Sequence, residues 1–119
     1  MFIRAFIQAK TNIEAETSLK NLFVLAEEVH LKLRITSFEP YWKFDDSFQI
    51  EMEGESITDG QLNKFLGGIA TKWNNFSESY LATTTIEGCT LLLENFEFIE
   101  VLPNEVEFSR RVCEVFYLK

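Results

Sequence analysis

Residues 44–55 read FDDSFQIEMEGE, and this stretch indicates most directly how the chain folds. From Ser47 to Glu53 the side chains alternate between apolar and polar. The apolar set is Phe48, Ile50 and Met52, and the polar set is Gln49, Glu51 and Glu53. Alternation with a period of two is the pattern of a half-buried strand. Two more acids, Asp45 and Asp46, precede it, so the stretch predicts a strand with one acidic face.

The residues upstream of this strand predict a strand, a helix and a second strand. Residues 1–10 carry apolar side chains on both faces, which is typical of a central strand that is covered on each side. Residues 11–29 have apolar side chains at helical spacing and begin with a capping box, Thr11 with Glu14. Residues 30–38 alternate again, with Ile35 on the buried face, and predict a strand. This strand is expected to form an antiparallel hairpin with the strand at residues 47–53.

The residues downstream of it predict a second helix and further strands. Residues 57–73 form the helix, with a second capping box at Thr58 and Gln61. Its Gly67-Gly68 pair predicts a close contact between helix and sheet. Residues 78–88 read as a strand and residues 90–102 as one bent strand or two. For residues 104–118 a strand is favoured over a short helix that begins at Glu105.

These elements define the predicted fold class. It is α+β: a mainly antiparallel sheet with two helices on one face, ferredoxin-like in its β-α-β-β-α start and extended by extra C-terminal strands. At 119 residues, with 46% hydrophobic side chains, the chain is expected to be one domain, residues 1–119.

Composition narrows the class of function. The net charge of −8 leaves no surplus of bases to neutralise phosphates, so neither nucleic acid nor a membrane surface is an expected partner. No segment approaches a membrane span and the N-terminus lacks the pattern of a signal peptide, so a cytoplasmic protein is expected. Cys89 and Cys113 lack metal-binding spacing and are expected to be reduced, buried thiols, with a disulfide as the alternative.

The acids are concentrated in two segments. Residues 39–59 contain seven acids and one base, and residues 87–107 contain six acids and no base, so each segment carries −6. The other 77 residues therefore carry +4. If the two segments lie side by side in the sheet, they form one acidic face with a potential of several kT. Solvation alone is a competing explanation, because charges on outward strand positions keep small proteins soluble.

No catalytic motif accompanies these acids. The single histidine, His30, falls where a helix gives way to a strand, which is typical of a capping or packing role. No cofactor is expected, because no phosphate-binding glycine loop surrounds Gly67-Gly68. A metal-dependent enzyme using Asp45, Asp46 and Glu51 is the third hypothesis, although the DDS sequence lacks the alternating ligands of a calcium loop.

Exposable aromatic residues interleave with the acids, as at interfaces with cationic partners. They are Tyr41, Trp42, Phe44 and Phe96. The segments EPYWKFDDSFQIEMEGESITD (residues 39–59) and EGCTLLLENFEFIEVLPNEVE (residues 87–107) carry a resemblance to a class of known proteins. With them, this small chain resembles the immunity proteins of bacterial polymorphic-toxin and contact-dependent inhibition systems.

The resemblance implies a non-enzymatic protein that binds and neutralises a basic, nuclease-like toxin domain. The residues predicted to contact it are Trp42, Asp45, Asp46, Glu51, Glu53, Glu97 and Glu100. The alternative is a self-associating regulatory or small-ligand-binding domain, which predicts a homodimer and leaves the acids as bystanders.

Overall fold

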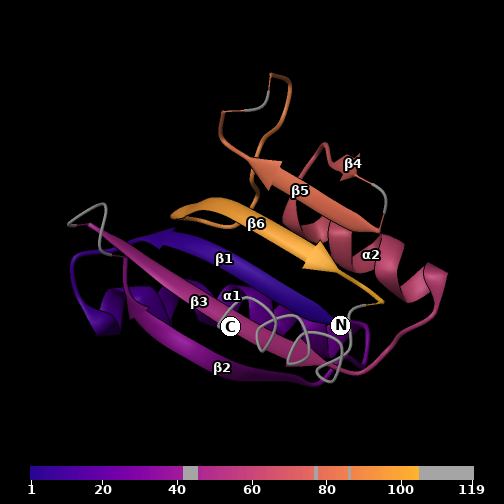
Figure 1. The fold of residues 1–119 in the computed structure, drawn as a ribbon, viewed down its shortest axis with the longest axis horizontal. Coiled ribbons are helices and arrows are strands. Elements are labelled where there is room, and N and C mark those ends of the chain that lie inside the picture. Colours follow the sequence, from indigo (N-terminus) through magenta and orange to yellow (C-terminus); the bar gives the residue numbers. More distant parts are fainter. Residues whose placement is uncertain (42–45, 77, 86, 105–119) are drawn as a thin grey trace, which may run out of the picture.

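The computed structural model describes residues 1–41, 46–76, 78–85 and 87–104. Its elements are β1 (Phe2–Gln8), α1 (Asn12–Glu28), β2 (Leu33–Pro40), β3 (Ser47–Gly54), α2 (Asp59–Ile69), β4 (Asn74–Phe76), β5 (Ser79–Thr83) and β6 (Phe96–Leu102). The six strands form one antiparallel sheet in the order β2-β3-β1-β6-β5-β4, and both helices lie on one of its faces (Figure 1). The α+β class is confirmed. The order β2-β3-β1-β6 is that of a split β-α-β sheet, which the β4–β5 pair widens at one edge.

Strand β1 is the centre of the sheet, as its two apolar faces predict. It pairs with β3 on one side and β6 on the other. On the face toward the helices, Ile3, Ala5 and Ile7 are completely buried. They join one core with the apolar stripes of both helices and the inner side chains of β3 and β6. Burial of this kind contributes about 1.5–3 kcal/mol for each large aliphatic side chain.

Both helices begin at the predicted caps, but only one capping box is complete. At α2, the Gln61 amide donates to the Thr58 hydroxyl, and the Gln61 side chain accepts from the Thr58 amide. At α1, the Thr11 hydroxyl accepts from the Glu14 amide, whereas the Glu14 carboxylate accepts from the backbone of Lys10. Gln61 also donates through Nε2 to the carbonyl of Val29 at 2.7 Å, which connects the start of α2 to the end of α1.

Helix α1 ends at a turn centred on His30. The His30 amide bonds to the Glu27 carbonyl and the Leu31 amide to the Ala26 carbonyl, the two hydrogen bonds of a Schellman motif. His30 adopts a φ of 58°, the left-handed conformation that this motif requires at the position after the C-cap. The exposed histidine therefore has the capping role that its position predicts.

The predicted hairpin of β2 and β3 is confirmed, with a bulge between Ile35 and Ser37. Ile35 lies opposite the buried Met52 and so shares its face, as expected, but it stays 43% exposed. The reason is that β2 is an edge strand, beyond which the described sheet has no further cover. The bulge and the charged Arg34 make this edge a poor template for pairing with another strand.

The expected contact between the glycine pair and the sheet is wrong. A Cβ built on Gly68 would lie 2.9 Å from Cδ2 of Leu25 in α1, and one on Gly67 would meet nothing within 4 Å. The close approach that needs a glycine is therefore between the two helices, and only Gly68 makes it.

The chain after α2 differs from prediction in several details. The strand predicted at residues 78–88 is β5, Ser79–Thr83, and the strand predicted at residues 90–102 is β6, Phe96–Leu102. Strand β4 has only three residues, too few for a visible alternation, and it was not predicted. Phe96, expected to be exposable, is 3% exposed because it joins the core under β6. The predicted strand at residues 104–118 reaches only Asn104 within the described residues, and the structure places Asn104 in a turn after β6.

Candidate protein-binding surface

The face of the sheet opposite the helices carries the outward acidic side chains of β3 and β6 and several aromatic rings. Strand register sorts its outward side chains into rows that cross the sheet. One row runs Ser37, Glu51, Arg4, Glu100 and Leu81, from β2 to β5. The next row toward the end of β1 runs Glu39, Gln49, Phe6, Phe98 and Thr83. We call this side the helix-free face, because neither α1 nor α2, the helices of the described residues, lies on it.

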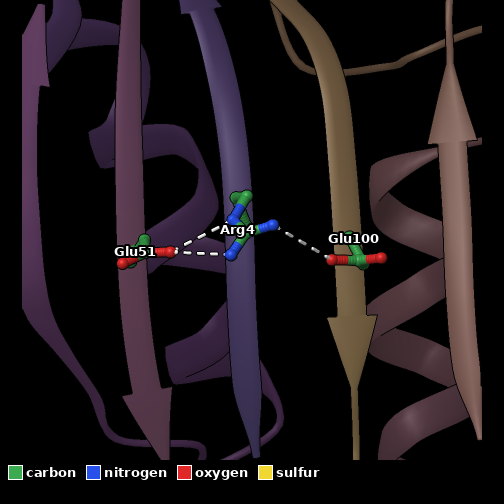
Figure 2. Close-up of polar contacts among 3 residues, drawn as sticks. All are labelled: Arg4, Glu51 and Glu100. Atoms are coloured by element: carbon green, nitrogen blue, oxygen red, sulfur yellow. Dashed lines mark hydrogen bonds and ion pairs between the residues drawn. The ribbon is translucent and has the colours of Figure 1, made fainter. Parts of the chain in front are cut away.

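Arg4 connects the two acidic strands at the middle of this face (Figure 2). Its Nε and Nη2 lie 3.1 and 3.0 Å from the same carboxylate oxygen of Glu51. On the other side, its Nη1 lies 3.9 Å from Glu100. Strand β1 therefore separates β3 from β6, so the condition for one continuous acidic face, two acidic segments side by side, is not met by these strands. The central row carries two carboxylates and one guanidinium.

A second arginine neutralises another acid on this face. Nη2 of Arg34 lies 2.8 Å from Glu53, in the adjacent row. The Glu51 and Glu53 side chains are each 17% exposed, so both carboxylates are largely removed from water beside an arginine. The middle of the helix-free face is consequently less acidic than the sequence of β3 suggests.

Both acidic segments are hydrogen-bonded to neighbouring residues at the end of β1. The Ala9 amide donates to the Asp46 carbonyl at 2.9 Å, and the Gln8 amide donates to the Asn95 carbonyl at 2.8 Å. These bonds hold the start of β3 and the start of β6 on either side of the same chain end. Glu97 is the extra residue at the bulge where β6 changes register against β1.

Three of the described acids lie on or directly beside strand ends here, and we call them the acidic rim. The end of β1 lies on the left in Figure 1. They are Glu39, Asp46 and Glu97. Glu39 and Asp46 are exposed and Glu97 is partly exposed.

An aromatic cluster lies beside the acidic rim. The rings of Phe6 and Phe98, opposite one another in register, have centroids 5.1 Å apart at an interplanar angle of 54°. The ring of Tyr41, at the end of the β2–β3 hairpin, lies 4.8 Å from Phe6 at 43°. Tilted rings at these separations attract one another. All three side chains are partly exposed, so apolar surface lies at the same end of the sheet as the acidic rim.

The structure divides the predicted contact residues into groups. Asp46 and Glu97 belong to the acidic rim, while Glu51, Glu53 and Glu100 lie near the two arginines. Trp42 and Asp45 lie outside the described residues, as do Phe44 and Cys113.

Sequence reasoning missed Arg4, Arg34, Phe6, Phe98 and Glu39 as site residues. Their outward strand positions were visible in the alternation, but their neighbours depend on pairings between distant strands.

Other kinds of site find little support in the described ranges. No group of three or more His, Cys, Asp or Glu side chains there could hold a metal ion. Cys89 is a free, partly buried thiol whose Sγ lies 3.4 Å from the carbonyl of Lys72. Neither α1 nor α2, the helices of the described chain, has the length and apolar character needed to cross a membrane.

Comparison with known proteins adds no assignment. No protein-family model, no curated protein sequence and no solved structure matches the chain.

Proposed function

We propose that this protein binds a cationic protein partner through the aromatic cluster and the acidic rim. In this proposal it acts as an immunity-type protein in the cytoplasm, and the partner is a basic, nuclease-like toxin domain. The observation that carries the proposal is that both acidic segments bond to the end of β1, beside the partly exposed rings of the aromatic cluster. An apolar centre with a charged border is the usual composition of a specific interface.

The two components contribute to different steps of binding. The exposed carboxylates of the acidic rim attract a positively charged surface over several ångströms and raise the association rate. The rings of the aromatic cluster then lose their remaining contact with water against the partner, which slows dissociation. The acids beside Arg4 and Arg34 contribute less to attraction, because their charge is already largely compensated.

The first test is to identify the partner and its activity. Tagged protein is used to isolate partners from lysate of its source cells at about 50 mM and about 500 mM salt, since screening weakens charge attraction at the higher concentration. A stoichiometric basic protein lost at high salt is then expressed with and without this chain, and cell survival and nuclease activity are measured. Protection of the cells supports the proposal. A toxic partner that this chain leaves fully active would contradict it.

The second test concerns the acidic rim. Asp46→Asn combined with Glu97→Gln is expected to lower the association rate constant about tenfold at low salt, with little change in dissociation. Stopped-flow or surface-based kinetics would measure both constants. The control is Glu16→Gln with Glu28→Gln, two exposed acids of α1, which remove the same charge from the opposite side of the molecule. Equal slowing by both pairs would show that net charge, and not the rim, drives association.

A further inference from the structure

The helix-free face already contains one arginine held by a ring and a carboxylate. The guanidinium carbon of Arg4 lies 5.7 Å from the centroid of the Phe2 ring, while the same group pairs with Glu51. An aromatic ring face and a carboxylate both bind a guanidinium group favourably. Arg4 therefore shows which contacts an arginine side chain makes on this face: one with a ring and one with a carboxylate.

Rings and an acid also share a row of the sheet farther along β1, where Glu39 lies two strands from Phe6. Phe6 follows Arg4 on the same face of the strand and is joined there by Phe98 from β6. The acidic rim supplies carboxylates at this end. Among the described residues, however, the cation–π contact to Phe2 is the only one, and no cation lies over Phe6 or Phe98. Arg4 and Arg34, the arginines that the structure describes on this face, both pair with glutamates in other rows.

From this arrangement we infer that the Phe6–Phe98 ring pair is a subsite for an arginine side chain of the partner. The guanidinium stacks on the ring pair and pairs with a carboxylate of the acidic rim. Arginine fits better than lysine, because its planar group stacks on a ring and binds a carboxylate through two hydrogen bonds at once. The inference rests on the proposed function and specifies the chemistry of the partner at this site.

The experiment compares two fluorescent probes, an oligo-arginine peptide and an oligo-lysine peptide of equal length. Each is titrated with the full chain at low salt, and binding is followed by fluorescence anisotropy. The arginine probe is expected to bind more tightly than the lysine probe. Phe98→Leu should weaken arginine binding about two- to fivefold and lysine binding less, because the planar guanidinium also stacks on the ring. Phe98→Trp should tighten arginine binding, since Trp is the best partner for a cation.

The matched control is Phe76→Leu. Phe76 is 59% exposed, lies on β4 and pairs with Ser79 at the start of β5. Phe98 lies opposite Thr83, at the other end of β5. It is therefore a more exposed phenylalanine outside the subsite, and its replacement should change neither titration. Circular dichroism and urea unfolding of each variant separate a loss of binding from a loss of folding.

The outcomes distinguish this inference from the proposed function. Equal binding of the two probes, or equal effects of the Phe98 and Phe76 substitutions, would overturn the arginine subsite and leave a general acidic surface intact. Absence of binding by both probes would overturn the subsite and also remove the electrostatic basis of the proposed function. Tighter binding of arginine that depends on Phe98 supports the subsite, whether or not a toxin partner is found.

Discussion

Arg4 determines how much negative charge the middle of the sheet presents. It is 36% exposed, and it lies between Glu51 on β3 and Glu100 on β6. The two glutamates are two strands apart, a separation of about 10 Å at the usual strand spacing. Without the guanidinium they would repel one another across β1, in a site with limited access to water.

Replacement of Arg4 should therefore destabilise the fold in a salt-dependent way. We expect Arg4→Gln to lower the free energy of unfolding by about 1–2 kcal/mol at low salt, between the values typical of exposed and buried pairs. The loss should shrink at high salt, where the repulsion between the glutamates is screened. Urea unfolding at two salt concentrations would measure it.

Arg34→Gln serves as the comparison, because Arg34 is 69% exposed and its pair with Glu53 should contribute less than about 1 kcal/mol. If Arg4→Gln lowers the free energy of unfolding no more than Arg34→Gln does, the central role of Arg4 is contradicted.

His30 is strained by its place in the Schellman turn. Its φ of 58° is a conformation in which a Cβ is disfavoured, whereas glycine adopts it freely. We expect His30→Gly to raise the free energy of unfolding by about 0.5–1 kcal/mol, measured from the urea midpoint. His30→Ala retains the Cβ and should give no gain. Equal stabilisation by both variants would point to loss of the imidazole as the cause.

At the scale of the elements, helix α2 offers a test of how closely the two helices approach. Gly67 has open space around its Cβ position, so Gly67→Ala should stabilise the protein by about 1 kcal/mol through helix propensity. Gly68→Ala should gain less or lose stability, since the new methyl must displace the Leu25 side chain. Thermal unfolding of the two single variants gives the comparison. If both gain equally, Leu25 moves aside at no cost.

The elements themselves were largely predictable from local pattern. Alternation in residues 47–53 and helical spacing in residues 11–29 reflect which side chains meet the core, and Thr11 and Thr58 marked the helix starts. Strand β4 was missed because three residues carry no period. The element packed against Gly68 was misassigned. Helix propensity indicates where a glycine lowers stability, but it does not indicate which neighbouring residue requires the glycine.

At the scale of the whole molecule, the sheet should lose stability from its edges inward. Amides in the middle of β1 are bonded on both sides and lie above the core, whereas β2 has a partner on one side only within the described sheet. We expect hydrogen exchange to be slowest in β1, close to the rate set by global unfolding, and much faster in β2 and β4. Exchange measured by mass spectrometry or NMR would test this order. Protection of β2 equal to that of β1, with a dimer in solution, would favour the self-association alternative.

The candidate site was less predictable than the fold, because it depends on strand order. The sequence showed two acidic segments, but it did not show that β1 would lie between them with Arg4 on its outward face. Nor could it show that Asp46 and Asn95 would flank the same chain end. Both facts follow from pairings between residues that are far apart along the chain.

The position of β1 has a consequence for biosynthesis. β1 is made before β6, yet Phe2 lies opposite Leu102, so one edge of the central strand stays open until most of the chain has left the ribosome. At about 5–20 residues per second this interval lasts for seconds, during which the apolar side chains of β1 can meet other nascent chains. Recombinant yield should therefore depend strongly on growth temperature and chaperone supply, even though the finished fold is well packed.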